Sequence, residues 1–240
     1  MIHLTTSGLD LYKELKQLLV NYRFKPGMQL YPSDLADRFK VSATPIREAL
    51  YRLTGEKLLD SIPNRGFFSK ILDLKEMNEL SMVITALLKQ AIIIRSSLDS
   101  EIRLDFCSDD ESPSSSDARD SCLRSIEHKL VEIASMSGNQ VLSDIVRNIN
   151  DRTHYIWLLD LECELRRNDI QRHIGELVEY LSTGDVAAAL NNLDKQMRRK
   201  LALMPTLVKE GLVRSFTGPP PTRLLEPRLH ASVSNSLPRT

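Results

Sequence analysis

Apolar residues between positions 35 and 58 recur at intervals of three and four, which predicts two short helices joined by a tight turn. The turn lies at Val41-Ser42, where the Ser42 hydroxyl is placed to cap the second helix, and Pro45 suits that helix's first turn. The apolar stripe of the second helix leaves an outward face of five residues: Thr44, Arg47, Glu48, Tyr51 and Arg52. This is the layout of a DNA recognition helix, although many amphipathic helix pairs never touch DNA.

Two short strand patterns follow this helix pair, over residues 58–62 and 67–71. Between them, Pro63-Asn64-Arg65-Gly66 predicts a hairpin turn in which Gly66 supplies a positive φ. A helix pair followed by such a hairpin is typical of a winged helix, whose wing brings an arginine to the DNA backbone or minor groove. The hairpin therefore strengthens the prediction of DNA binding and places Arg65 at the tip of the wing.

Residues 12–70 resemble the DNA-binding domain of the GntR family of bacterial transcription regulators. The matching residues are Leu11-Tyr12, Leu15, Pro26-Gly27, Leu30, Asp34-Leu35-Ala36, Val41-Ser42, Thr44-Pro45-Ile46-Arg47-Glu48-Ala49-Leu50, Leu53 and Asn64-Arg65-Gly66. The resemblance implies a homodimer on a palindromic double-stranded operator, usually as a repressor. It assigns base reading to Arg47 and phosphate contacts to Ser42, Thr44 and Arg52, and Arg65 with Gly66 places the wing in the minor groove. The family usually has Arg where this chain has Ala43, so one basic contact is missing.

The remaining pattern is helical, and the 240 residues leave room for a second domain. The expected helices cover residues 9–22, 74–98, 120–136, 140–167, 168–182 and 185–210. The apolar positions of the helix over 74–98 cover more than one face, which indicates burial against its own domain and a partner subunit. The acidic, serine-rich segment 108–119 is expected to be a mobile loop, and residues 213–240 a disordered tail.

The predicted fold class is therefore mainly α. An N-terminal winged helix-turn-helix domain with a small β-wing spans residues 1–74, and an all-α effector-binding and dimerisation bundle spans 75–212. Formal net charge is zero, but residues 1–74 are mildly basic and 99–120 acidic, which is compatible with DNA binding. Three cysteines without metal-site spacing suit a reducing cytoplasm. The sequence shows no N-terminal signal and no apolar run of membrane-spanning length, so we expect a cytoplasmic protein.

The second half is similar to the all-helical effector domain of the FadR-like branch of the GntR family, the FCD domain. The matching stretches are His128-Lys129-Leu130, Ser137-Gly138-Asn139, His173, Gly184-Asp185 and Ala189. In many members of this branch an Asp and three His hold a divalent metal beside a carboxylate effector. The Asp position, four before His128, is Arg124 here, and the last His position falls near Gln196. His128 and His173 alone would make a poor site for zinc, manganese or nickel.

The presence of Arg124 at the family's Asp position suggests that the effector is a small carboxylate or phosphorylated metabolite bound without metal. Arg124 offers a bidentate fork to an anion, and we expect it to act with His128, Arg152, His173 and Gln196. A solvent-facing Arg124 is an equally simple interpretation. A constitutive DNA-binding dimer with a degenerate effector domain stays open as the alternative function. Neither a nucleophile–base pair nor paired carboxylates occur at readable spacing, so we do not expect an enzyme.

Overall fold

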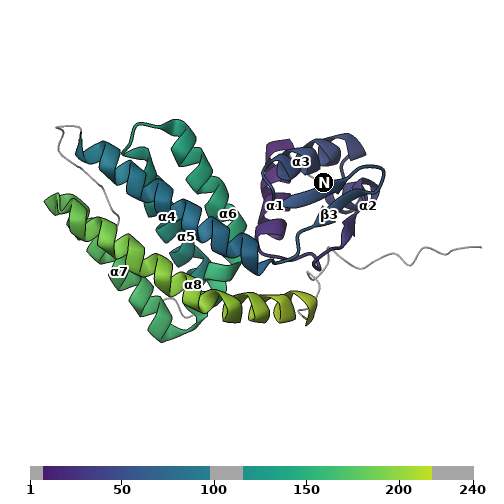
Figure 1. Cartoon of the computed structure of the whole chain (residues 1–240). Helices are drawn as coiled ribbons and strands as arrows, with labels where there is room; N and C mark the ends of the chain where they lie inside the picture. The colour runs from purple at the N-terminus through teal and green to yellow at the C-terminus, as the bar shows by residue number, and fades with distance from the viewer. Residues whose placement is uncertain (1–7, 98–115, 218–240) are drawn as a thin grey trace, which may run out of the picture.

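The computed structural model describes residues 8–97 and 116–217 and shows a small N-terminal domain beside a larger bundle of helices (Figure 1). The N-terminal domain contains, in order, α1 (Gly8–Val20), β1 (Gln29–Leu30), α2 (Pro32–Phe39), α3 (Ala43–Gly55), β2 (Leu59–Ile62) and β3 (Gly66–Ser69). The bundle contains α4 (Leu74–Ser96), α5 (Ser116–Ser135), α6 (Gln140–Glu162), α7 (Glu164–Thr183) and α8 (Val186–Thr217). The predicted fold class, mainly α with a winged helix-turn-helix and a small β-wing, is confirmed.

The N-terminal domain folds around the apolar stripe of α3. Ile46, Leu50 and Leu53 are completely buried and pack with apolar residues of α1 and α2 in one core. The three strands form an antiparallel sheet in the order β1-β3-β2, with Leu59 opposite Ser69 at one end of the hairpin. Burial of the α3 stripe fixes the rotation of this helix and so turns its polar face outward.

The turn of the wing has the backbone conformation that its sequence predicts. Asn64 has φ of 60° and Gly66 has φ of 92°, both in the region that L-residues with a Cβ rarely adopt. The Arg65 amide donates to the Ile62 carbonyl at 3.0 Å and closes the turn. This confirms the role of Gly66 as a conformational requirement of the hairpin.

Helix α4 packs against three other helices of the bundle, α5, α6 and α8. It begins at Asp73, whose carboxylate accepts from the Glu76 amide at 2.7 Å, as a capping box requires. By length and composition alone α4 could cross a membrane, which the sequence analysis did not anticipate. It nevertheless buries eight residues in the domain core, as soluble core helices do, so this is weak evidence for a membrane span.

The opposite side of α4 carries exposed apolar residues. Met82, Val83 and Ile93 keep between 45% and 46% of their surface exposed. They fall on one face of the helix because their spacing follows its turn. The prediction that the apolar positions of α4 cover more than one face is therefore confirmed, and no segment among residues 8–97 and 116–217 covers the outer face.

Three predicted boundaries are wrong. Helix α8 extends to Thr217, so residues 213–217 are helical rather than part of a tail, and 218–240 lie outside the described residues. Helix α5 begins at Ser116, inside the predicted loop 108–119, and 108–115 also lie outside the described residues. Helix α6 ends at Glu162 because Cys163 has an extended backbone, with φ of −82° and ψ of 116°.

Close packing at Gly211 brings α8 against the segment that joins the two domains. A Cβ built at Gly211 would lie 2.9 Å from Leu72 Cδ1 and 3.2 Å from Leu159 Cδ1. Leu72 belongs to the short connection between β3 and α4 and is buried. A methyl group at this position would therefore force the Leu72 side chain to shift.

Candidate DNA-binding surface and effector pocket

The outward face of α3 presents its side chains to solvent as predicted. Thr44, Arg47, Glu48, Tyr51 and Arg52 are all exposed, while the opposite stripe is buried. Ser42 is the N-cap residue with extended backbone, but its side chain makes no capping hydrogen bond. The predicted capping contact is therefore absent, and the exposed Ser42 hydroxyl remains at the start of the helix, where backbone amides can bind an anion.

Arg52 is held in place within the domain. Its guanidinium carbon lies 3.9 Å from the centre of the Tyr12 ring, and its Nε lies 3.3 Å from Glu56 Oε1. The Tyr12 hydroxyl donates to the same Glu56 oxygen at 2.6 Å. Burial raises the pKa of Glu56, but hydrogen bonds from Tyr12 and Lys16 outweigh it, so the net shift is downward. Arg52 is thus partly exposed and pre-oriented beside an ionised carboxylate.

The wing is attached to α3 and to β1. Tyr51 of α3 packs edge-on against Phe67 with ring centres 5.0 Å apart. The Arg65 guanidinium lies 5.5 Å from the centre of the Phe68 ring, and the Gln29 side chain donates to the Arg65 carbonyl. Side-chain contacts therefore join the outward face of α3 and the tip of the wing into one surface.

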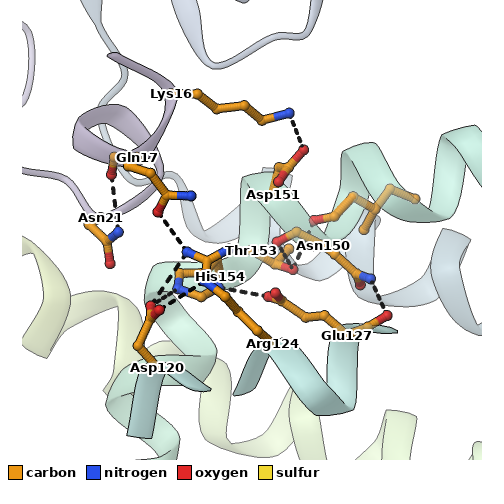
Figure 2. A network of polar contacts seen from close by, with 11 residues as sticks. Lys16, Gln17, Asn21, Asp120, Arg124, Glu127, Asn150, Asp151, Thr153 and His154 are labelled. Carbon is orange, nitrogen blue, oxygen red and sulfur yellow. Dashed lines mark hydrogen bonds and ion pairs between the residues drawn. The ribbon is translucent and has the colours of Figure 1, made fainter. Parts of the chain in front are cut away.

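A polar junction joins the N-terminal domain to the bundle (Figure 2). Lys16 of α1 bridges Glu56 at 3.0 Å and Asp151 of α6 at 2.6 Å. Burial lowers the pKa of Lys16, but its bonds to Asp151 and Glu56 reverse this and raise the pKa. The Asn148 amide donates to the Glu56 carbonyl at 2.8 Å. These contacts connect the end of α3 directly to α6.

A second set of contacts continues from α1 into the interior of the bundle (Figure 2). Arg124 of α5 donates to Gln17 Oε1 at 2.7 Å and to Asp120 Oδ2 at 2.8 Å. His154 of α6, which is 1% exposed, lies between Asp120 Oδ1 at 2.9 Å and Glu127 Oε1 at 2.8 Å. The series of contacts therefore runs from Gln17 to Glu127 without interruption.

The charges in this series shift one another's pKa values. Burial lowers the pKa of His154, but Glu127 and Asp120 outweigh it and the net shift is upward. Burial raises the pKa of Asp120, but Arg124 and His154 outweigh it and the net shift is downward. Both shifts favour an imidazolium held between two carboxylates.

A cavity lies inside the bundle, next to this series. Its space free of atoms is about 520 Å³ when the part open to solvent is included, and α4, α5, α6, α7 and α8 all contribute to its wall. Its lining residues are Ser81, Ile84, Leu123, Ile126, Glu127, Leu130, Asn150, Thr153, Trp157, Leu161, Ile170 and Lys200. Glu127 lines the cavity and also bonds His154, so the cavity wall and the polar series share one side chain.

Comparison with known proteins agrees with this architecture. Residues 8–68 match the model of the bacterial regulatory proteins of the gntR family. The chain carries a GntR-family DNA-binding domain. It is 28% identical over 208 residues to the Nta operon transcriptional regulator of Aminobacter aminovorans, an alignment covering 84% of this chain and 98% of that protein. That protein aligns over nearly its full length and the family match covers the winged helix, so the comparisons support a DNA-binding transcription regulator, and neither match is to an enzyme.

Solved structures show the same fold over both domains of this regulator. A putative GntR transcriptional regulator from Rhodococcus sp. RHA1 superposes with a TM-score of 0.61 at 15% identity, covering 84% of this chain and 99% of that chain. Escherichia coli McbR/YncC superposes with a TM-score of 0.58 at 20% identity, covering 86% of this chain and 99% of that chain. At these identities the likeness concerns the fold alone.

The residues predicted to bind the effector of this regulator do not line the cavity. Arg124 is engaged by Asp120 and Gln17, because its helix turns it toward α1 rather than toward the bundle interior. Arg152 pairs with Glu76 at 2.5 Å at the domain junction. Their charges are already matched within the protein, so these contacts do not favour the anion site built on Arg124, which stays a prediction.

His128 and His173 do not form a shared ligand cluster. The His128 side chain is 74% exposed and lies 3.3 Å from Glu132 on the same helix. His173 is mostly buried beside Asp169 and Glu176, and Gln196 lies one turn after Asn192, which contacts the His173 carbonyl. Among residues 8–97 and 116–217, no group of three or more His, Cys, Asp or Glu side chains could hold a metal ion. The two histidines therefore do not fit the metal that the family resemblance implies.

Sequence reasoning missed His154 and Lys200. The signal for His154 is present, since Asp120, Arg124 and Glu127 recur at intervals of four and three on one face of α5. A buried histidine opposite Asp120 and Glu127 could have been inferred only if the packing of α5 against α6 were known. Lys200 follows two other basic residues, Arg198 and Arg199. The sequence alone therefore could not show that Lys200 lines a cavity, because a run of basic residues is usually exposed to solvent.

Proposed function

We propose that this chain is a repressor of the FadR-like branch that acts in the bacterial cytoplasm. It binds a palindromic operator as a homodimer and is controlled by a small anionic metabolite in the helical domain. The observation that carries the proposal is the exposed polar face of α3 beside an ordered wing. A single winged helix reads only a few base pairs, so two copies are needed for a specific operator.

On this proposal, Arg47 reads a base in the major groove, because it is exposed at the centre of the α3 face and has no ion-pair partner among the described residues. Ser42 and Thr44 at the start of α3 bind backbone phosphate, as does Arg52, whose ring stacking limits its mobility. Arg65 and Gly66 place the wing in the minor groove. Ala43 leaves Arg47 with most of the base reading.

The exposed apolar face of α4, formed by Met82, Val83 and Ile93, supports dimerisation. A contiguous apolar face of a core helix is costly in water and is stabilised when a second copy covers it. Two copies paired along α4 would carry their winged helices on one symmetric particle, as a palindromic operator requires. The distance between the two winged helices then depends on how each is held against its bundle.

Control by an effector is supported by the position of the cavity. Glu127 lines it, and from there polar contacts lead through His154, Asp120 and Arg124 to Gln17 of the DNA-binding domain. A ligand that changes the position of Glu127 alters contacts that hold α1, and coupling of about 1–3 kcal/mol is typical of such linked sites. The cavity favours this function over the alternative of a constitutive DNA-binding dimer.

The proposal is tested by selecting preferred sequences from random double-stranded DNA and measuring affinity for the selected operator. We expect Arg47→Ala to weaken operator binding by about 1–3 kcal/mol and to relax selection at one base pair per half-site. Arg198→Ala, an exposed arginine on α8, is the matched control and should leave binding unchanged. Equal losses for Arg47→Ala on operator and random DNA would contradict base reading by Arg47.

A further inference from the structure

The cavity inside the bundle offers a ligand almost no polar groups. Its wall is made mainly of aliphatic side chains and the Trp157 ring. The Ser81 hydroxyl donates to the Met77 carbonyl at 2.9 Å, and the Thr153 hydroxyl donates to the Ile149 carbonyl at 2.9 Å. The Asn150 amide donates to the Glu127 carbonyl at 3.1 Å. The hydrogen bonds of these three side chains are therefore donated to backbone carbonyls, and most of the cavity wall is apolar.

The charged lining residues are Glu127, which is engaged by His154, and Lys200, which enters the cavity from α8. Its Nζ lies 4.3 Å from the centre of the Trp157 ring. Within the described parts of the chain Lys200 makes no ion pair. Burial lowers the pKa of Lys200 to about 8, and the nearby acids only partly offset it. An amine held in an apolar cavity without a counter-ion is energetically costly unless a ligand supplies the negative charge.

The acids nearest to Lys200 are already paired with other cations. Asp160 is fully buried and pairs with Arg166 at 2.7 Å and Arg199 at 3.0 Å. Glu127 pairs with His154 at 2.8 Å. Among residues 8–97 and 116–217, therefore, the acids nearest to Lys200 are already paired, and a bound ligand can supply its counter-charge.

We propose that this cavity binds a monocarboxylic acid with an apolar body, anchored by a salt bridge from Lys200 to the carboxylate and requiring no metal. The binding of this ligand does not depend on the proposed function. Its role in controlling DNA binding does, because the cavity lies in the domain proposed to bind the effector. The apolar wall excludes small dicarboxylates and phosphorylated sugars, whose further charges would be buried without partners. The aliphatic side chains and the Trp157 ring of the wall suit a hydrocarbon or aromatic body.

Direct binding is measured by calorimetry on the full chain, with butanoate, hexanoate, octanoate and phenylacetate as probes. Affinity should rise about fourfold per added methylene until the cavity is full, because each CH₂ leaves water. Octanol should bind at least about tenfold more weakly than octanoate, since it cannot pair with Lys200. Chelator should leave octanoate binding unchanged. Tighter binding of malonate, or of octylammonium, would overturn the proposal.

Lys200→Met isolates the anchor, because methionine retains the length and apolar character of the stem without the charge. Octanoate affinity should fall about tenfold or more in this variant, while octanol affinity stays within about twofold. Lys195→Met, an exposed lysine of the same helix, is the matched control and should bind both probes as the wild type does. Equal loss for octanoate and octanol in Lys200→Met would overturn the salt bridge.

A pH titration of the wild type provides a measurement that does not depend on how the variant folds. Charged groups around Lys200 are Glu127 from α5, Asp160 from α6 and Arg199 from its own helix, while the lining residues of α4 and α7 are uncharged. Octanoate affinity should be highest below pH 8 and fall as the pH rises above it, because the anion binds the ammonium form. Octanol affinity should not change over that range. An octanoate affinity that does not vary between pH 7 and pH 9.5 would overturn the anchor.

Operator affinity is measured on the same preparations. A protein that binds its operator but none of the acids retains the proposed DNA-binding function and overturns the ligand assignment. A protein that binds octanoate through Lys200 but selects no DNA supports the ligand assignment and contradicts the proposed function.

Discussion

His154 shows how one buried side chain couples charge to stability. Its upward-shifted pKa means that the folded state binds a proton more tightly than the unfolded chain, for which about 6.5 applies. The stabilising contribution is therefore complete below about pH 6.5 and is lost as the pH rises through the folded pKa. Asp120 acts in the opposite direction at acidic pH, where its lowered pKa contributes stability that is lost as the pH falls.

We expect the free energy of unfolding to decrease with rising pH above about 6.5, with a slope of at most about 1.4 kcal/mol per pH unit from this one group. In His154→Gln that slope should disappear, because glutamine does not titrate. Chemical unfolding at a series of pH values measures it. His128→Gln is the control, since that side chain is 74% exposed. A profile for His154→Gln parallel to the wild type would contradict this account.

At the residue scale the sequence predicted what depends on local spacing and failed where partners come from distant segments. The exposure of Arg47 follows from the helical period of α3 alone and is confirmed. The orientation of His128 and Arg124 depends on how α5 is rotated against α6 and α1, which its own pattern does not fix. The same limit explains why His154 was not recognised as the buried histidine.

At the element scale, helix and strand identities were predicted well because each follows from periodicity and turn chemistry. The break at Cys163 was missed because no Gly or Pro marks it. The end of α8 was placed too early because the sequence after Gly211 contains a cluster of prolines that begins only at Pro219. Even Pro205 lies inside α8.

The wing and the recognition helix give a paired test of backbone conformation. Gly66→Ala should lower the free energy of unfolding by about 1–2 kcal/mol, because its φ of 92° is costly for an L-residue while its nearest neighbour leaves room for a methyl. Gly55→Ala should raise it by about 0.4–1 kcal/mol, because this residue is helical and has nothing within 4 Å. Thermal or chemical unfolding measures both. Equal effects of the two substitutions would rule out the conformational explanation.

At the scale of the whole molecule, the uncovered face of α4 is the feature that a monomer does not explain. We expect Val83→Lys to convert a dimer to a monomer, since a charge would be buried between two copies, and operator affinity should fall with it. Sedimentation velocity reports the first effect. Val141→Lys, which changes a 67% exposed valine on α6, is the control. An unchanged dimer in Val83→Lys would place the interface elsewhere.

The close approach at Gly211 has a mechanical consequence. Lys200 and Gly211 lie eleven residues apart on the same helix, or about 16 Å along its axis, and no loop interrupts them. Helix α8 therefore links the cavity to Leu72 as one continuous helix. Pro205 lies between the two ends and lacks an amide hydrogen bond, so the helix bends most easily there. Leu72 Cδ1 would lie 2.9 Å from a Cβ built at Gly211, so the absence of a side chain there lets α8 approach the connection closely. A displacement of α8 along its axis would therefore change its packing against Leu72 in the connection that carries the DNA-binding domain.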